Sequence, residues 1–233
     1  HVVSYFNSPS LSDGVIQCEE EQFKIHKLVL CAQSKFFSTA FNGEWKESAE
    51  GVVHLKDDVR VVEAMLHFMY TFDYEAIGDA ENSPSPMVFN VKVYSIAEKY
   101  DIPALKLLAK QKLQKTAEIC WDMDDFPHAV AEIYASTPSA DQSLRQLSTE
   151  ISCDHIKQLL AKQGFRDVLD EAVGFASDVA QFLAKNQVRS IQPKKYTCPG
   201  CEHTFEAVIP PGRSCYCIYC GSNRSNWKSY TSA

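Results

Sequence analysis

The sequence predicts an α+β protein in which a short sheet and a helical cluster come first, further helices follow, and a small metal-held unit ends the chain. Three observations predict this: a strand that runs straight into helices at residues 23–42, apolar residues at helical spacing between residues 87 and 185, and two Cys-x-x-Cys pairs after residue 197. The domain boundaries that we expect are 8–120, 121–190 and 194–228.

The composition is that of an ordinary globular protein. The 233 residues are 45% hydrophobic and 23% charged, and no run of eighteen apolar residues is present, so we expect no contact with a membrane. The formal net charge of -7 is uneven, because residues 194–233 hold five Lys and Arg against two Glu, which leaves about -10 for residues 1–193. We therefore expect the body of the chain to repel nucleic acid, whereas the C-terminal segment need not.

A change in the spacing of apolar residues predicts the N-terminal strands and helices. Residues 11–18 read as a strand, and Phe23 and Ile25 then alternate with polar residues as in a half-buried strand. From Leu28 onwards the apolar residues fall at helical spacing. Ser34 interrupts this helix and is a residue type that caps helices, which predicts a second helix with a buried face of Phe36, Phe37, Ala40 and Phe41.

The next segments predict one more strand and several helices. We expect a strand at residues 52–57, then a helix at 59–71 whose cap is Asp57 or Asp58. Residues 72–86 are rich in loop-forming residues and predict an insertion. Further helices are expected at residues 87–100, 103–119, 126–136, 140–160 and 164–185, and proline at position 103 separates the first two.

These residues resemble the central segment of the BTB/POZ domain family. The family pattern matches His26, Lys27, Leu30, Ser34, Phe36 and Phe37 in this order. The block at residues 94–109 is also close to the family pattern, especially to the version common in single-BTB fungal proteins. The resemblance implies a BTB/POZ fold at residues 8–120 that serves protein–protein interaction, and the helices that follow look like the extension found in many adaptors.

The resemblance also implies a partner site at Trp45, Lys46 and Glu47. In BTB proteins that recruit the BTB-specific cullin, a hydrophobic-x-Glu triplet occupies this loop, and its apolar residue inserts into a groove on the cullin's helical N-terminal domain. A tryptophan in a polar loop is typical of interface anchors, although Trp45 can instead pack on its own domain. We therefore expect a substrate adaptor of a cullin–RING ubiquitin ligase.

We do not expect an enzyme. The chain lacks a phosphate-cradling glycine loop, a dinucleotide fingerprint, a zincin helix and a nucleophile elbow, so we assign no catalytic residue.

The most specific motif consists of Cys198, Cys201, Cys217 and Cys220, two Cys-x-x-Cys knuckles that fifteen residues separate. Four thiolates at this spacing can close a tetrahedron around Zn²⁺, with bonds of about 2.3 Å. The segment between the knuckles alternates like a strand and then turns at Pro210, so residues 194–228 resemble a zinc ribbon.

We expect a structural zinc, because four protein ligands leave no position for water. His203 and Cys215 are rival ligands, and Cys215 is expected to be a packed or free thiol. Cysteines at metal-ligand spacing also favour a reducing compartment, so we expect an intracellular protein of the cytoplasm or nucleus.

A second function stays open at this point. The protein can instead be a nuclear BTB scaffold whose ribbon contacts nucleic acid or a partner protein through the following residues: Lys194, Lys195, Arg213, Tyr216, Tyr219, Arg224, Trp227 and Lys228. A charge of about +3 on this segment is small for binding phosphates. BTB dimers of the animal type use an N-terminal helix and strand that residues 1–10 are too short to supply, so we favour a monomer over BTB-mediated self-association.

Overall fold

The structure is a computed structural model that describes residues 2–43, 49–75, 85–190, 193–209 and 214–231. The chain divides into two compact units, His1–Val179 and Ala180–Ala233. The Trp45-Lys46-Glu47 triplet, most of the expected insertion at residues 72–86 and the expected turn at Pro210 lie outside the described residues.

A three-stranded sheet with the order β2-β1-β3 opens the first unit, after the short 3₁₀ helix η1 (Val2–Tyr5). Strand β1 (Gly14–Cys18) pairs antiparallel with β2 (Glu21–Ile25) and parallel with β3 (Val52–Leu55). Ile16 lies opposite Phe23 on one side and Val53 on the other, and all three are buried. The first strand begins later than the expected position 11, because Leu11 has a left-handed backbone (φ 61°) that a strand does not accommodate.

Two short helices follow β2, as the sequence predicts: α1 (Lys27–Cys31) and α2 (Lys35–Asn42). Ser34 caps α2, since its Oγ accepts a hydrogen bond from the Phe37 N–H at 3.1 Å. Of the expected buried face, Phe37 and Phe41 are buried and Ala40 is half-buried, whereas Phe36 is 39% exposed, so the expectation for Phe36 is wrong. The Phe36 ring packs instead against the edge of Tyr100, with centroids 4.8 Å apart.

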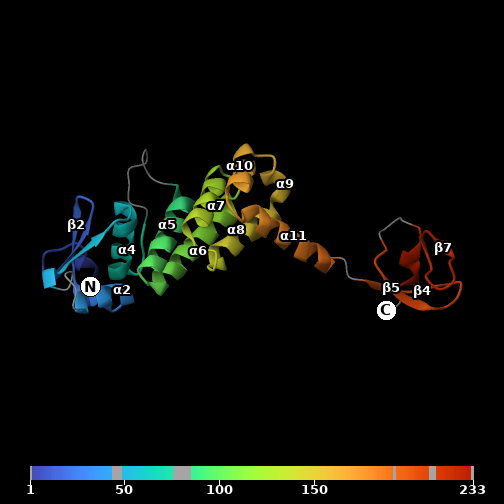
Figure 1. The fold of residues 1–233 in the computed structure, drawn as a ribbon, viewed down its shortest axis with the longest axis horizontal. Coiled ribbons are helices and arrows are strands. Elements are labelled where there is room, and N and C mark those ends of the chain that lie inside the picture. The colour runs from blue at the N-terminus through green and yellow to red at the C-terminus, as the bar shows by residue number, and fades with distance from the viewer. Residues whose placement is uncertain (1, 44–48, 76–84, 191–192, 210–213, 232–233) are drawn as a thin grey trace. The chain divides into compact units, whose positions relative to one another are not determined.

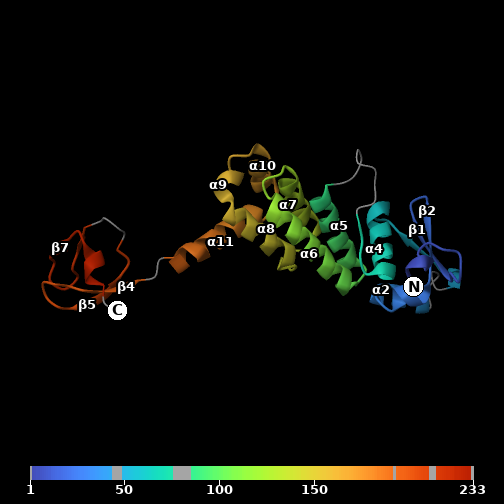
Figure 2. The same cartoon turned by 180° about the vertical axis from the view of Figure 1, so that it is seen from behind.

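Helix α4 (Val59–Thr71) lies beside the sheet (Figure 1, Figure 2). Of the two expected capping residues it uses Asp58, whose carboxylate accepts from the Arg60 N–H at 3.0 Å. Asp57 instead accepts hydrogen bonds from Lys99 and Tyr100. Helices α5 (Pro86–Lys99) and α6 (Pro103–Cys120) pack on each other and are separated at the expected place, where Asp101 is left-handed (φ 52°).

Five helices continue the first unit and lead into the second: α7 (Asp125–Ser136), α8 (Gln142–Asp154), α9 (Ile156–Leu159), α10 (Gln163–Glu171) and α11 (Phe175–Ser190). Two expected helices are therefore each broken in two. His155 leaves the helical conformation, and its ring stacks on Trp121 with centroids 3.8 Å apart. Gly174 has φ 96°, which no helix accommodates, and it separates α10 from α11.

Polar contacts attach these later helices to the earlier ones. The Asp141 carboxylate accepts hydrogen bonds from the Tyr94 hydroxyl at 2.8 Å and from the Lys106 ammonium at 2.8 Å, which joins α8 to α5 and α6. Tyr134 of α7 donates to Asp178 of α11 at 2.7 Å. None of the helices within the described ranges is long and apolar enough to cross a membrane.

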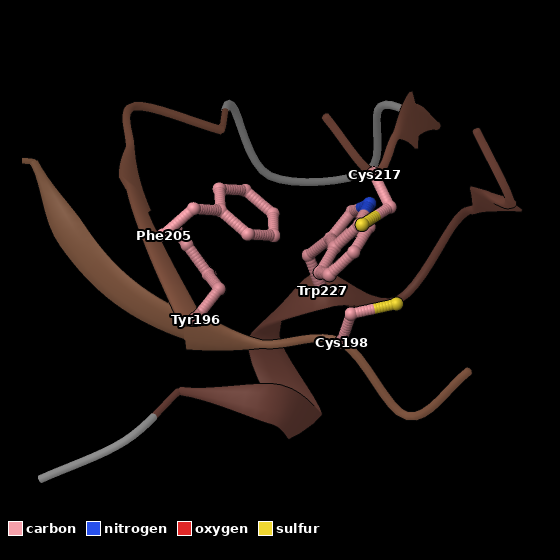
Figure 3. Packing of buried hydrophobic residues seen from close by; sticks show 5 residues of the cluster. All are labelled: Tyr196, Cys198, Phe205, Cys217 and Trp227. Carbon is pink, nitrogen blue, oxygen red and sulfur yellow. The ribbon is translucent and has the colours of Figure 1, made fainter. Parts of the chain in front are cut away.

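The second unit ends in two small antiparallel hairpins. Strand β4 (Lys194–Thr197) pairs with β5 (Thr204–Ala207), β6 (Cys215–Tyr216) pairs with β7 (Asn223–Arg224), and the 3₁₀ helix η2 (Trp227–Tyr230) follows. The rings of Tyr196, Phe205 and Trp227 gather in one apolar cluster (Figure 3). The Trp227 indole N–H donates to the Cys215 carbonyl at 2.9 Å, so this cluster ties η2 to both hairpins.

Candidate metal centre

The four predicted zinc ligands meet beside this aromatic cluster. The sulfur atoms of Cys198, Cys201, Cys217 and Cys220 all lie within 4.8 Å of one another. Two contacts connect the knuckles, because Cys198 and Cys220 lie 3.8 Å apart and Cys201 and Cys217 lie 3.7 Å apart. Four sulfurs at about 2.3 Å from a central Zn²⁺ stand about 3.8 Å from one another in a regular tetrahedron. The donor set and its spacing therefore fit tetrahedral zinc.

The two knuckles share one hydrogen-bond pattern. In the first, the Gly200 N–H points at the Cys198 sulfur at 3.4 Å, and in the second the Tyr219 N–H points at the Cys217 sulfur at 3.4 Å. The fourth residue after the leading cysteine of each knuckle, Glu202 or Gly221, donates its N–H to the carbonyl of that cysteine and has a left-handed backbone. Donors aimed at sulfur favour the thiolate, which is the form that binds metal.

Ser222 adds a hydroxyl to this centre. Its Oγ lies 3.2 Å from the Cys220 sulfur and 3.8 Å from the Cys198 sulfur, so one side chain reaches thiols of both knuckles. Nothing in the sequence singled out this residue, because serine is common in turns. Its position is nevertheless typical of groups that hydrogen-bond to metal ligands and hold them in place.

The pKa values of three of the thiols shift, two downwards and one upwards. The Gly200 N–H, helped by Ser222, lowers the pKa of Cys198 to about 6, and the Ser222 hydroxyl and N–H lower the pKa of Cys220. Although the His203 backbone N–H acts in the opposite direction, burial and the neighbouring thiols raise the pKa of Cys201 to about 12. Four clustered sulfurs repel one another's negative charge, so a cation is needed for all of them to ionise at neutral pH.

The two rival ligands lie outside the group of four sulfurs. The His203 Nδ1 is 2.8 Å from the Cys201 carbonyl, and the imidazole packs against the Tyr219 ring with centroids 4.8 Å apart. Cys215 is half-buried against the aromatic cluster. Among the residues that the structure describes, the cluster therefore consists of the two Cys-x-x-Cys pairs.

The aromatic residues suggested for nucleic-acid contact differ in their exposure to solvent. Trp227 is 2% exposed and belongs to the core of the second unit, so its ring is not free to stack on a base. Tyr216 and Tyr219 are both exposed. The sequence alone does not reveal that this small unit uses the Trp227 indole as core.

Comparison with known proteins assigns the first half of the chain. A family model described as the BTB/POZ domain matches residues 3–117. BTB/POZ and MATH domain-containing protein 6 of Arabidopsis thaliana is 27% identical over 185 residues, which cover 74% of this chain and 42% of that protein. Kelch repeat protein M-T8 of Myxoma virus (strain Lausanne) is 23% identical over 184 residues, which cover 78% of this chain and 34% of that protein. The chain therefore spans less than half the length of either curated relative.

Among solved structures, the chain is similar to the BTB domain of zebrafish PATZ1. The identity is 18% and the TM-score is 0.36, and the match covers 45% of this chain and 77% of that one.

Proposed function

Because residues 3–117 of this chain are a BTB/POZ domain, a protein–protein interaction module, we propose that the protein is a substrate adaptor that presents targets to a cullin–RING ubiquitin ligase. The match to this domain is the observation that carries the proposal. The two curated relatives support it, because their names join a BTB/POZ domain with a MATH domain or refer to kelch repeats. Their matches cover 74% and 78% of this chain, more than residues 3–117 account for, so the similarity continues into the later helices.

In this proposal the cullin binds the segment between α2 and β3. Trp45 supplies the apolar anchor and Glu47 the charge of the hydrophobic-x-Glu triplet, with Lys46 between them. A large aromatic side chain that becomes buried at an interface typically carries much of the binding energy, and its removal commonly costs about 2 kcal/mol or more. The target protein is then held by the helices after α6 or by the C-terminal unit.

A pull-down with the N-terminal domain of the BTB-specific cullin tests this assignment. We expect the parent chain to capture the cullin, and we expect Trp45→Ala and Glu47→Lys to lose capture. Glu20→Lys, an equal change of charge at an exposed site between β1 and β2, is the control and should capture like the parent. Equal capture by the parent and both loop variants, or capture by none, would remove the adaptor assignment.

We further propose that Cys198, Cys201, Cys217 and Cys220 hold one structural Zn²⁺. When bound, the ion neutralises the thiolates and links the two hairpins. A unit of about forty residues buries too little surface to fold unaided, and zinc ligation worth on the order of 10–16 kcal/mol offsets this deficit. Four protein ligands leave no open position for chemistry at the metal.

The proposal has four further features. They are an intracellular location, a monomeric state, a kinship with single-BTB fungal proteins and domain boundaries at 8–120, 121–190 and 194–228. The nuclear scaffold that contacts nucleic acid is the weaker alternative, because Trp227 is buried and Lys195 stands opposite Glu206 in the β4–β5 pair.

A further inference from the structure

A groove of about 1020 Å³ lies between α7 and α10. The two helices pack side by side (Figure 1, Figure 2), and residues of the turns that flank α10 also line the groove. This volume is at the upper end of small-molecule pockets and has room for several side chains of another protein.

The walls of the groove are mostly apolar. Helix α7 contributes Ala131 and Ala135, which are exposed and small, and α10 contributes the buried side chains of Phe165 and Val168. Val173 follows α10 at one end and is 89% exposed. Phe165 and Val168 are buried beneath the groove, and the small exposed alanines of α7 leave a hollow that aliphatic side chains of a partner can fill.

The charged groups around the groove are mainly negative. Asp124, Asp167 and Glu171 are exposed there, and the Asp124 side chain is 99% accessible. Lys162 is the opposing charge, but its ammonium already donates to the Asp122 carbonyl and lies 3.9 Å from Asp124. His128 also lines the groove, and its Nδ1 is 2.8 Å from the Asp124 carbonyl. A partner with Lys or Arg beside its apolar residues therefore complements this rim.

We propose that the α7–α10 groove docks a basic segment of a target protein, with small aliphatic side chains in the groove and Lys or Arg side chains against Asp124, Asp167 and Glu171. The proposal rests on the adaptor function above and extends it by naming the class of target. The formal charge of about -10 on residues 1–193 supports the same choice, because it attracts basic partners and repels acidic ones.

Selection of random dodecapeptides displayed on phage against the full chain tests this docking. We expect the selected peptides to carry Lys or Arg next to Ala, Val or Leu, and to bind more weakly as salt concentration rises. In fluorescence anisotropy, Ala131→Trp fills the groove and should weaken peptide binding by about tenfold or more. The double variant Asp167→Lys with Glu171→Lys should do the same by repelling the basic side chains.

Two control variants match these changes. Ala104→Trp puts the same bulk on an exposed position of α6, and Asp170→Lys makes a single charge reversal, half the charge change of the double variant, on α10 at a residue that does not line the groove. Both should bind the peptides like the parent chain. Circular dichroism of all variants should show the helical content of the parent, so that lost binding is not lost folding.

Three outcomes would overturn the proposal: no enriched peptides, enriched peptides without basic residues, or peptides that bind the groove variants as they bind the parent. Cullin capture is measured separately and should survive in the groove variants. If these variants lose the cullin instead, the groove belongs to the ligase and the target assignment is wrong. If Trp45→Ala and Glu47→Lys capture the cullin as the parent chain does, the adaptor function fails, even where the groove binds peptides.

Discussion

The sulfur atoms of Cys198 and Cys220 lie 3.8 Å apart, although 22 positions separate the two residues in the chain. This contact joins the first residue of one knuckle to the last residue of the other, and Cys201 and Cys217 make the matching contact at 3.7 Å. Each knuckle sits at the end of one hairpin, so the two hairpins meet through sulfur on one side and through Trp227 on the other (Figure 3). The order of this unit should therefore depend on what the sulfurs bind.

Zinc content is the first consequence. We expect one Zn²⁺ per chain by elemental analysis, and we expect Cys217→Ser to lose it together with the ordered environment of Trp227 in near-UV circular dichroism. Cys215→Ser is the matched control, because Cys215 lies outside the cluster, and it should keep the metal. Retention of zinc by Cys217→Ser, or its loss from Cys215→Ser, would show that the ligand set is wrong.

Ser222 should tune the affinity of this site. Its hydroxyl reaches Cys220 at 3.2 Å and Cys198 at 3.8 Å, and removal of such supporting groups typically weakens metal binding by about tenfold or more. We expect Ser222→Ala to show this loss in competition with a chromophoric chelator, whereas the exposed Ser225→Ala should not. Equal affinities of the two variants would deny Ser222 this role.

Ser34 should matter for the stability of the first unit. It is 2% exposed, caps α2 at the Phe37 N–H and donates to the Tyr100 carbonyl at 2.6 Å. Ser34→Ala removes both hydrogen bonds, so we expect the free energy of unfolding in urea to fall by about 1–3 kcal/mol. Thr39→Ala, on the exposed side of the same helix, should change it by less than about 0.5 kcal/mol. Similar losses in both variants would contradict this role of Ser34.

The Asp141 carboxylate should make the stability of the first unit depend on pH. Burial raises the pKa of this carboxyl, but the Lys106 ammonium, the Tyr94 hydroxyl and the Ser143 N–H outweigh burial and hold the pKa below its ordinary value. Its contribution is therefore fully present above the pKa of an unfolded aspartate, about 4, and is lost as pH falls through the lower folded value.

Urea titrations at several pH values test this dependence. We expect Asp141→Asn to be less stable than the parent at pH 7, and the difference between them to shrink as the pH falls well below about 4. Asp170→Asn, on the exposed side of α10, is the control and should follow the parent throughout. A difference that stays constant down to low pH would show that Asp141 acts by shape rather than by charge.

The features that the sequence predicted correctly are local ones. The cap at Ser34, the cap at one of Asp57 and Asp58, and the break before Pro103 each depend on residues within one turn of chain. The clustering of the four cysteines could also be predicted, because metal ligation dictates its own spacing. Gly174 carried a usable signal as well, since a glycine in a helical pattern often marks its end, yet we expected the helix to continue.

The features that the sequence did not reveal depend on distant partners. Phe36 was expected to be buried, but its ring packs against Tyr100, which directly follows α5 and lies far from Phe36 in the sequence. The α7–α10 groove likewise depends on how two helices separated by α8 and α9 come together, and helical periodicity alone does not give this pairing. Trp227 became core because the small second unit has few other apolar side chains to bury.

The adaptor function is tested most directly by calorimetric titration of the full chain with the N-terminal domain of the BTB-specific cullin. We expect saturable binding at one cullin per chain, and we expect Trp45→Ala to abolish it while Glu20→Lys retains it. No heat of binding with the parent chain, or the same affinity for the parent and Trp45→Ala, would contradict the assignment of this BTB domain to the ligase.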